Sequence, residues 1–192
     1  FTALVNWTFR NRFARSLLDR FLGVDKRRTI APLVAETFEE WFRGRSHSVT
    51  PTMRGKVLFM NDTFTNYNYP GIGRAAVRIL EAIGFEVAIA EMGCCGRPQI
   101  SSGLLREARD MAADNLMRLS GAIRAGTPIV GVEPSCLLTL RDEYSELIVG
   151  EDTRRLADSV FLLEEFLLHL KEKGELDLRF RERTGKTLFH GH

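Results

Sequence analysis

Two of the three cysteines in this 192-residue chain stand side by side, in the stretch GCCGRP at residues 93–98. Adjacent thiols between glycines, directly after a short apolar run, occupy a bend where the backbone can approach a ligand closely. Cys136 follows another apolar run, at residues 128–132. Thiols gathered in one place can hold a soft metal or attack a disulfide, whereas a free cysteine by itself is often buried and inert. Cys94, Cys95 and Cys136 are therefore a candidate redox or metal centre, with a buried turn as the structural alternative.

The elements that must position these thiols form an alternation of short apolar runs and helical patterns from residue 56 onward. Strands are predicted at residues 56–60, 86–91, 127–132 and 186–189. Helices are predicted at residues 71–83, 101–124, 135–147 and 162–170, with a segment of mixed character at 156–161. Strands that alternate with helices of this length favour an α/β fold with a parallel, doubly wound, Rossmann-like sheet.

Four polar side chains come soon after predicted strands. Asp62 follows the first strand, Cys94 and Cys95 follow the second, and Cys136 follows the third. Because ligands of an open parallel sheet gather outside the carboxyl ends of its strands, we expect all four side chains at one edge. The following helices present their N-termini there, and the helix dipole favours the thiolate form. Asp62 has a structural alternative, because an Asp in a loop often caps the turn that follows it.

The first 55 residues differ from the rest in pattern and in charge. Helical periodicity covers residues 4–21 and 32–42, and a linker rich in Gly, Ser, Thr and Pro follows at 43–55. Residues 1–55 contain ten Lys or Arg and five Asp or Glu, whereas residues 56–192 contain 17 and 20. We expect an N-terminal helical extension whose basic face meets solvent or another domain. No nucleic-acid-binding motif accompanies this charge, so no nucleic-acid partner is predicted.

The composition is that of an ordinary globular protein, with 44% hydrophobic and 27% charged residues. No apolar run reaches the roughly 18 residues that a membrane-spanning helix needs. Three cysteines are too few, and odd in number, for a secreted disulfide framework, which favours reduced thiols and a cytoplasmic location. The chain begins at Phe1 and ends within a predicted strand, so we expect it to be an internal piece of a larger protein.

Three separated motifs resemble the cysteine-rich CCG domain of iron-sulfur oxidoreductases: DTFTNY at residues 62–67, CCGRP at 94–98 and EPSC at 133–136. That family includes iron-sulfur subunits of glycolate oxidase, anaerobic glycerol-3-phosphate dehydrogenase and heterodisulfide reductase. It also includes large fused FAD-linked D-2-hydroxyacid dehydrogenases of the D-lactate type, which this chain resembles most. The resemblance implies a helical connector at residues 1–50, a first CCG repeat at 56–180 and the start of a truncated second CCG repeat at 186–192.

In the fused class, the resemblance implies, an FAD-binding domain and a ferredoxin-like module with two 4Fe-4S clusters precede the connector. The whole enzyme is then expected to oxidise a 2-hydroxy acid such as lactate, glycolate or 2-hydroxyglutarate at FAD and to pass electrons through its clusters to an acceptor. This chain would contribute an electron-transfer or thiol redox site, docked on the upstream domains, and would not catalyse the reaction alone. Peripheral association with the inner membrane is a further expectation.

The site that the resemblance implies consists of Cys94, Cys95 and Cys136 as ligands of an iron-sulfur cluster. Asp62 and Glu133 stand where the heterodisulfide reductase type has cysteines, and they are further candidate ligands. Carboxylate oxygen is a harder ligand than thiolate, so a mononuclear metal or a metal-free thiol site stays open. The ferredoxin spacing C-x-x-C-x-x-C is absent, which places the ordinary cubane clusters in upstream domains.

Other classes of function have weaker sequence support. Residues 71–76, GIGRAA, fit the glycine pattern of a dinucleotide-binding loop, with Glu91 at the expected distance beyond them. Ten residues separate these glycines from the preceding predicted strand, whereas that loop requires them directly after it. The alternatives are a module that binds a small anion or nucleotide through Arg74 or Arg97, and a purely structural docking domain.

Overall fold

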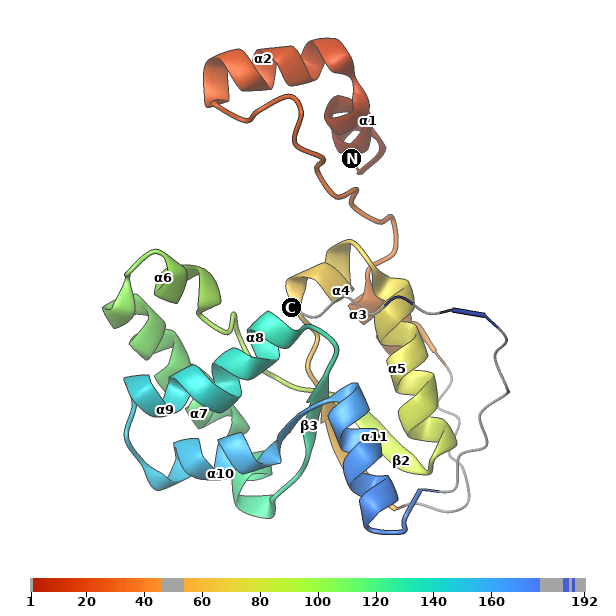
Figure 1. Ribbon diagram of the computed structural model, residues 1–192, viewed down its shortest axis with the longest axis vertical. Coiled ribbons are helices and arrows are strands. Elements are labelled where there is room, and N and C mark those ends of the chain that lie inside the picture. The colour runs from red at the N-terminus through yellow and green to blue at the C-terminus, as the bar shows by residue number, and fades with distance from the viewer. Residues whose placement is uncertain (1, 46–53, 177–184, 187, 189–192) are drawn as a thin grey trace.

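The computed structural model describes residues 2–45, 54–176, 185, 186 and 188, and the body of the molecule is an α/β unit (Figure 1). Four parallel strands form one sheet in the order β2-β1-β3-β4. The strands are β1 (Gly55–Phe59), β2 (Phe85–Ile89), β3 (Ile129–Gly131) and β4 (Val160–Leu162). The parallel α/β fold predicted from the sequence is confirmed.

Helices cover both faces of this sheet (Figure 1). Apolar residues of α3 (Phe38–Gly44), α5 (Pro70–Ala82) and α11 (Leu163–Glu172) pack in one buried cluster. Those of α7 (Leu105–Ala125) and α10 (Glu151–Ser159) pack in a second cluster. Because successive residues of a strand point to opposite faces, Phe59 joins the first cluster and Met60, just beyond the strand, joins the second. The sheet is therefore doubly wound.

Short helices follow the carboxyl ends of three strands. They are α4 (Thr63–Tyr67) after β1, α6 (Arg97–Ser101) after β2 and α8 (Pro134–Leu138) after β3. A π-helical turn, η1 (Thr139–Glu143), continues α8 and leads into α9 (Tyr144–Leu147), in the region where the sequence predicted one helix. Such π turns inside helices occur frequently at functional sites.

Two predicted elements of the body differ from the structure. The helix expected at 101–124 begins at Leu105, and it is separated from α6 by Gly103, whose φ of 75° is incompatible with a continuing helix. The mixed segment at 156–161 contains the end of α10 and the start of β4. The predicted strand at 186–189 and the second-repeat segment at 186–192 lie outside the described residues, apart from Lys186 and Leu188.

The N-terminal extension is helical, as predicted, and stands apart from the α/β body (Figure 1). The single helix expected at 4–21 is two helices, α1 (Thr2–Arg10) and α2 (Arg12–Leu22), because Asn11 caps α2. The Asn11 side-chain oxygen accepts two backbone hydrogen bonds at 3.0 Å. Neither helix contains a buried residue. The helix predicted at 32–42 is reduced to α3, whose N-cap is Thr37.

Candidate thiol site

The predicted site residues lie at the carboxyl-end edge of the sheet. Asp62 follows β1, the vicinal pair Cys94 and Cys95 follows β2, and Glu133 and Cys136 follow β3. The strand order reverses between β1 and β3, since the chain moves outward to β2 and then returns past β1 to β3. Crevices outside such a switch point are the usual ligand sites of open α/β sheets.

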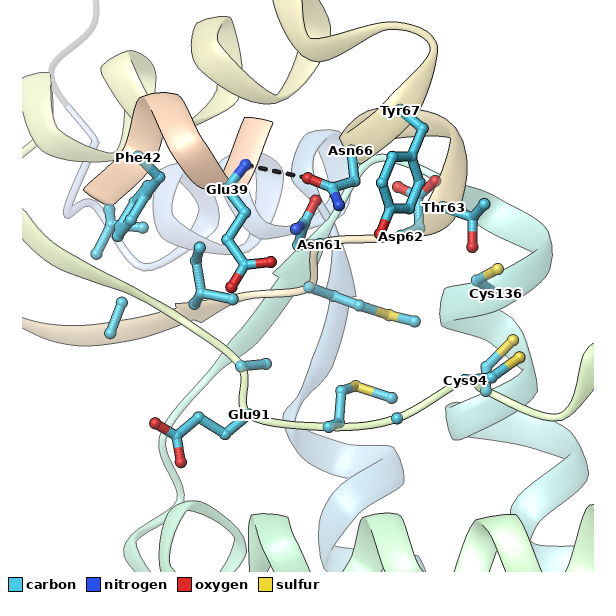
Figure 2. A pocket seen from close by; sticks show the side chains of 18 of the residues that line it. Glu39, Phe42, Asn61, Asp62, Thr63, Asn66, Tyr67, Glu91, Cys94 and Cys136 are labelled. Atoms are coloured by element: carbon cyan, nitrogen blue, oxygen red, sulfur yellow. Dashed lines mark hydrogen bonds between the residues drawn. The ribbon is translucent and has the colours of Figure 1, made fainter. Parts of the chain in front are cut away.

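The three sulfurs meet at this edge. Cys94, Cys95 and Cys136 line the same cleft, and Cys136 packs against the buried cluster that contains Cys95. Cys95 is only 3% exposed, Cys136 is half-buried and Cys94 is exposed. Figure 2 shows Cys94 and Cys136 at the same end of a cleft as Asp62. The arrangement therefore has a buried thiol and an exposed thiol beside it.

Interactions among the thiols separate the pKa values of Cys95 and Cys136. The neighbouring Cys136 thiol, with the Arg97 amide and the Cys94 thiol, lowers the pKa of Cys95 to about 7 despite its burial. The pKa of Cys136 is raised instead, first by its interaction with the Cys95 thiol, then by burial and by the negative charges of Cys95, Asp62 and Glu133. Cys95 therefore ionises first as the pH rises, and Cys136 keeps its proton.

Two glycines allow this convergence. Gly96 has a φ of 84°, in the left-handed region that glycine adopts readily, and this turn brings the Arg97 amide back to Cys95. Gly131, at the end of β3, lies so close to α8 that a β-carbon there would stand 2.9 Å from a methyl carbon of Leu137. A side chain at Gly131 would therefore require Leu137, the neighbour of Cys136, to shift.

The two carboxylates that the sequence offered as further ligands are engaged in local hydrogen bonds. Asp62 is 5% exposed and caps α4: its Oδ1 accepts from the backbone N–H groups of Phe64 at 2.8 Å and Thr65 at 3.0 Å. The Thr65 hydroxyl donates to the other carboxylate oxygen of Asp62. Glu133 accepts from the Ser135 hydroxyl at 2.7 Å. Asp62 therefore has the capping role that was its structural alternative.

A cleft of about 630 Å³ opens beside the thiols (Figure 2). Acidic residues of its wall are Glu39, Asp62, Glu86 and Glu91, whereas Arg43 alone is basic among the described lining residues. Arg43 pairs with Glu39 at 2.5 Å. The wall therefore carries a negative charge, which does not favour an anionic ligand.

The donor set fits part of an iron-sulfur site. Its three thiols are adjacent, but an ordinary cubane cluster takes four thiolates. In the part of the chain that the structure describes, no group of three or more His, Cys, Asp or Glu side chains is arranged to hold a metal ion. The three thiols are the donor type that an iron-sulfur cluster takes, but their arrangement does not by itself form a metal-holding group. A cluster would need further ligands from outside the described residues.

Sequence reasoning missed Asn115, which hydrogen-bonds to the thiol segment, and Tyr144, which hydrogen-bonds to Asn115. Asn115 of α7 hydrogen-bonds to the backbone of Gly93 and Cys94, and to the hydroxyl of Tyr144. The available signal was an amide within an otherwise apolar helical stripe, since the other buried residues of α7 are Ala108, Ala112, Leu119 and Ile123. A polar residue in such a stripe needs hydrogen-bond partners in the core.

The groups proposed for nucleotide or anion binding have structural roles. A β-carbon at Gly73 would lie 2.5 Å from Thr65 and 2.7 Å from Phe38, so this glycine permits close helix packing. Arg74 pairs with Glu36 at 2.5 Å. Arg97 pairs with Glu143.

Comparison with known proteins places the thiol segments in one family. Residues 60–141 match the cysteine-rich CCG domain. The chain is 30% identical over 192 residues to one of the subunits of the anaerobic glycerol-3-phosphate dehydrogenase of Escherichia coli K12, a match that covers 99% of this chain and 48% of that relative. The chain thus spans about half the length of this relative.

Two further relatives match a smaller part of the chain. The D-2-hydroxyglutarate dehydrogenase of Escherichia coli K12 is 32% identical over 111 residues, which cover 58% of this chain and 11% of that enzyme. Lactate utilization protein A of Geobacillus thermodenitrificans is 30% identical over 108 residues, which cover 53% of this chain and 43% of that protein. No solved structure matches the chain.

The lowered pKa of Cys95 beside Cys136 predicts a specific pH dependence. In the reduced, metal-free chain, the ultraviolet absorbance of one thiolate should appear as the pH rises through about 7, and it should be lost below that pH, because the pKa of Cys95 is lowered. Cys136→Ala removes the main cause of this lowering, so the midpoint should move up toward the ordinary cysteine pKa of about 8.5. Cys94→Ser is the matched control and should shift the midpoint less. An unchanged midpoint in Cys136→Ala would contradict the assignment.

Proposed function

Because residues 60–141 of this chain belong to the cysteine-rich CCG domain family, we propose that the chain supplies a thiolate site for electron transfer in an iron-sulfur oxidoreductase. The observation that carries the proposal is that Cys94, Cys95 and Cys136 line one cleft, although the two segments that carry them follow different strands of the sheet. Thiolates are the ligands by which proteins hold iron-sulfur clusters.

The residues of the chain have distinct roles in this proposal. Cys95 is the thiolate at neutral pH, and the Arg97 amide and the Cys136 thiol stabilise its charge. Cys136 loses its proton when iron binds, since a metal-bound thiol is deprotonated. Cys94 is exposed and is therefore accessible to a ligand or element from outside the chain. A cluster held there would accept and release one electron at a time.

The remaining ligand and the substrate chemistry belong to parts of the protein outside this chain. The chain spans 48% of its relative from the glycerol-3-phosphate dehydrogenase, which leaves room for a second CCG repeat with its own thiols. Relatives are named as dehydrogenases of glycerol-3-phosphate and of D-2-hydroxyglutarate. We infer that the whole protein, in the cytoplasm, oxidises a hydroxylated organic acid at FAD and that 4Fe-4S clusters in a ferredoxin-like domain connect FAD to the thiol site.

Iron uptake tests the proposal. Anaerobic reconstitution with iron and sulfide, with a small added thiol as the fourth ligand, should give the chain visible absorbance and bound iron. Cys95→Ala and Cys136→Ala should each lose most of this absorbance, because each removes one of three thiolates.

The control is Arg74→Ala, which alters a guanidinium that is paired with Glu36 and has no contact with the thiols. It should take up as much iron as the unmodified chain. Equal iron uptake by Cys95→Ala, Cys136→Ala and the unmodified chain would contradict the thiolate site. Loss of small-anion binding in Arg74→Ala, with no iron in any variant, would favour the anion-binding alternative.

The N-terminal helices support a second proposal, peripheral association with the inner membrane. Leu4, Trp7, Phe13, Phe21 and Leu22 are between 58% and 75% exposed. Residues 2–28 also contain seven Lys or Arg and two Asp. Exposed aromatic and aliphatic residues beside basic ones are typical of helices that lie in the surface of an anionic bilayer. Among the described residues, no helix is long and apolar enough to cross a bilayer.

Vesicle sedimentation tests the membrane proposal. The chain should sediment with vesicles that contain anionic phosphatidylglycerol and not with vesicles of pure phosphatidylcholine. Phe13→Ala combined with Phe21→Ala should weaken binding roughly a hundredfold or more, because burial of each Phe on insertion contributes about 2 kcal/mol. Met117→Ala, which changes an exposed apolar residue of the body, should leave binding unchanged. Binding that is equal for both lipids, or unaffected by the double change, would overturn the proposal.

A further inference from the structure

A single amide stands in the buried stripe of α7. Asn115 is 1% exposed and lies between Ala112 and Leu119, both of which are apolar and buried. An Asn in a helix core weakens the helix relative to Leu and must be desolvated. An apolar residue at this position would have no polar group to desolvate. The hydrogen bonds of the amide therefore indicate the role of Asn115.

The amide binds the backbone of the thiol segment through both of its ends. Its Oδ1 accepts from the N–H of Gly93 at 2.7 Å, and its Nδ2 donates to the carbonyl of Cys94 at 2.9 Å. An N–H can only donate and a carbonyl can only accept, so these partners fix the orientation of the amide. Asn115 therefore pairs with the backbone N–H of Gly93 and the backbone carbonyl of Cys94, as the backbone of a neighbouring strand would. This pairing lies beyond the end of β2.

The second N–H of the same amide reaches the segment that carries the third thiol. Nδ2 donates to the hydroxyl of Tyr144 at 2.8 Å. Tyr144 is fully buried at the start of α9, which continues through η1 from α8, the helix of Cys136. Burial raises the pKa of Tyr144, so its hydroxyl stays neutral and available as an acceptor. One side chain thus connects the vicinal cysteines to the run of helix behind Cys136.

An ion pair makes a parallel connection nearer the surface. Arg97, directly after the CCG turn, pairs with Glu143, the residue before Tyr144. Both side chains are partly exposed, and ion pairs in such positions contribute little because water screens them. The buried amide is therefore the stronger of the two connections.

We propose that Asn115 is the positioning residue of the thiol site: through Gly93, Cys94 and Tyr144 it holds the vicinal cysteines beside Cys136, in the cleft that all three cysteines line. The proposal rests on the proposed thiolate site. It adds the residue that sets the geometry of that site without contacting a ligand.

Arsenite is a probe of this geometry that does not depend on iron. One arsenic atom in the +3 state bonds to three thiol sulfurs; the three thiol protons and the three arsenic-bound hydroxyl groups leave as three waters, and no oxidation state changes. Tight binding requires three sulfurs around one point. The reduced whole chain should bind one arsenite and lose three titratable thiols.

Asn115→Leu keeps the bulk of the side chain and removes all three hydrogen bonds. It should weaken arsenite binding roughly tenfold or more and leave one thiol titratable. Tyr144→Phe removes only the hydroxyl and keeps the ring, so it should weaken binding less than Asn115→Leu. The matched control is Ile123→Ala, at an equally buried position in the same stripe two turns further along α7. It should lower the urea midpoint of unfolding and leave arsenite binding as in the unmodified chain.

The outcomes separate this proposal from the iron-sulfur one. If the unmodified chain binds arsenite through three thiols but takes up no iron, the iron-sulfur function fails and the role of Asn115 stands. If Asn115→Leu does not fold, Tyr144→Phe decides the question by the same readout. Arsenite binding in folded Asn115→Leu or Tyr144→Phe that matches the unmodified chain would overturn the positioning role.

Discussion

The packing of Cys136 against the buried cluster of Cys95 joins two distant parts of the chain, and the site depends on this contact. It forms because parallel strands end at the same edge of a sheet, so that loops after β2 and β3 lie near each other. The contact also gives the thiols unequal acidity, because the pKa of Cys95, the more buried sulfur, is lowered and that of Cys136 is raised. In the proposed thiolate site, Cys95 is therefore the first of the two thiols to ionise.

Three features around the thiols are unfavourable for stability in themselves but hold the thiol segments close together. Gly131 has no side chain at a buried position, so α8 can pack close to β3. Asn115 places an amide in an apolar stripe, and its three hydrogen bonds offset the desolvation. The π turn η1 interrupts a regular helix and brings both Glu143 and Tyr144 toward the thiol segment. Each of these features contacts the segment of the vicinal cysteines or the helix that carries Cys136.

The sequence predicted the parts of the fold that follow from local pattern. The strands at 56–60 and 86–91 and the helix at 71–83 each agree with β1, β2 and α5 to within two residues, because apolar runs and helical periodicity are local signals. The break at Asn11 and the π turn were missed, since a cap inside a periodic pattern and an i+5 hydrogen bond leave periodicity nearly intact. The ligand set of the cluster stays a prediction.

Disulfide mapping measures the central contact most directly. In a Cys94→Ser chain, mild oxidation with diamide can join only Cys95 to Cys136 within one molecule, and digestion followed by mass spectrometry identifies the linked peptides. The account predicts rapid formation of this intramolecular disulfide in the folded chain, and much slower formation in urea. Two thiols that stay free in the folded chain, or that form disulfides only between molecules, would contradict it.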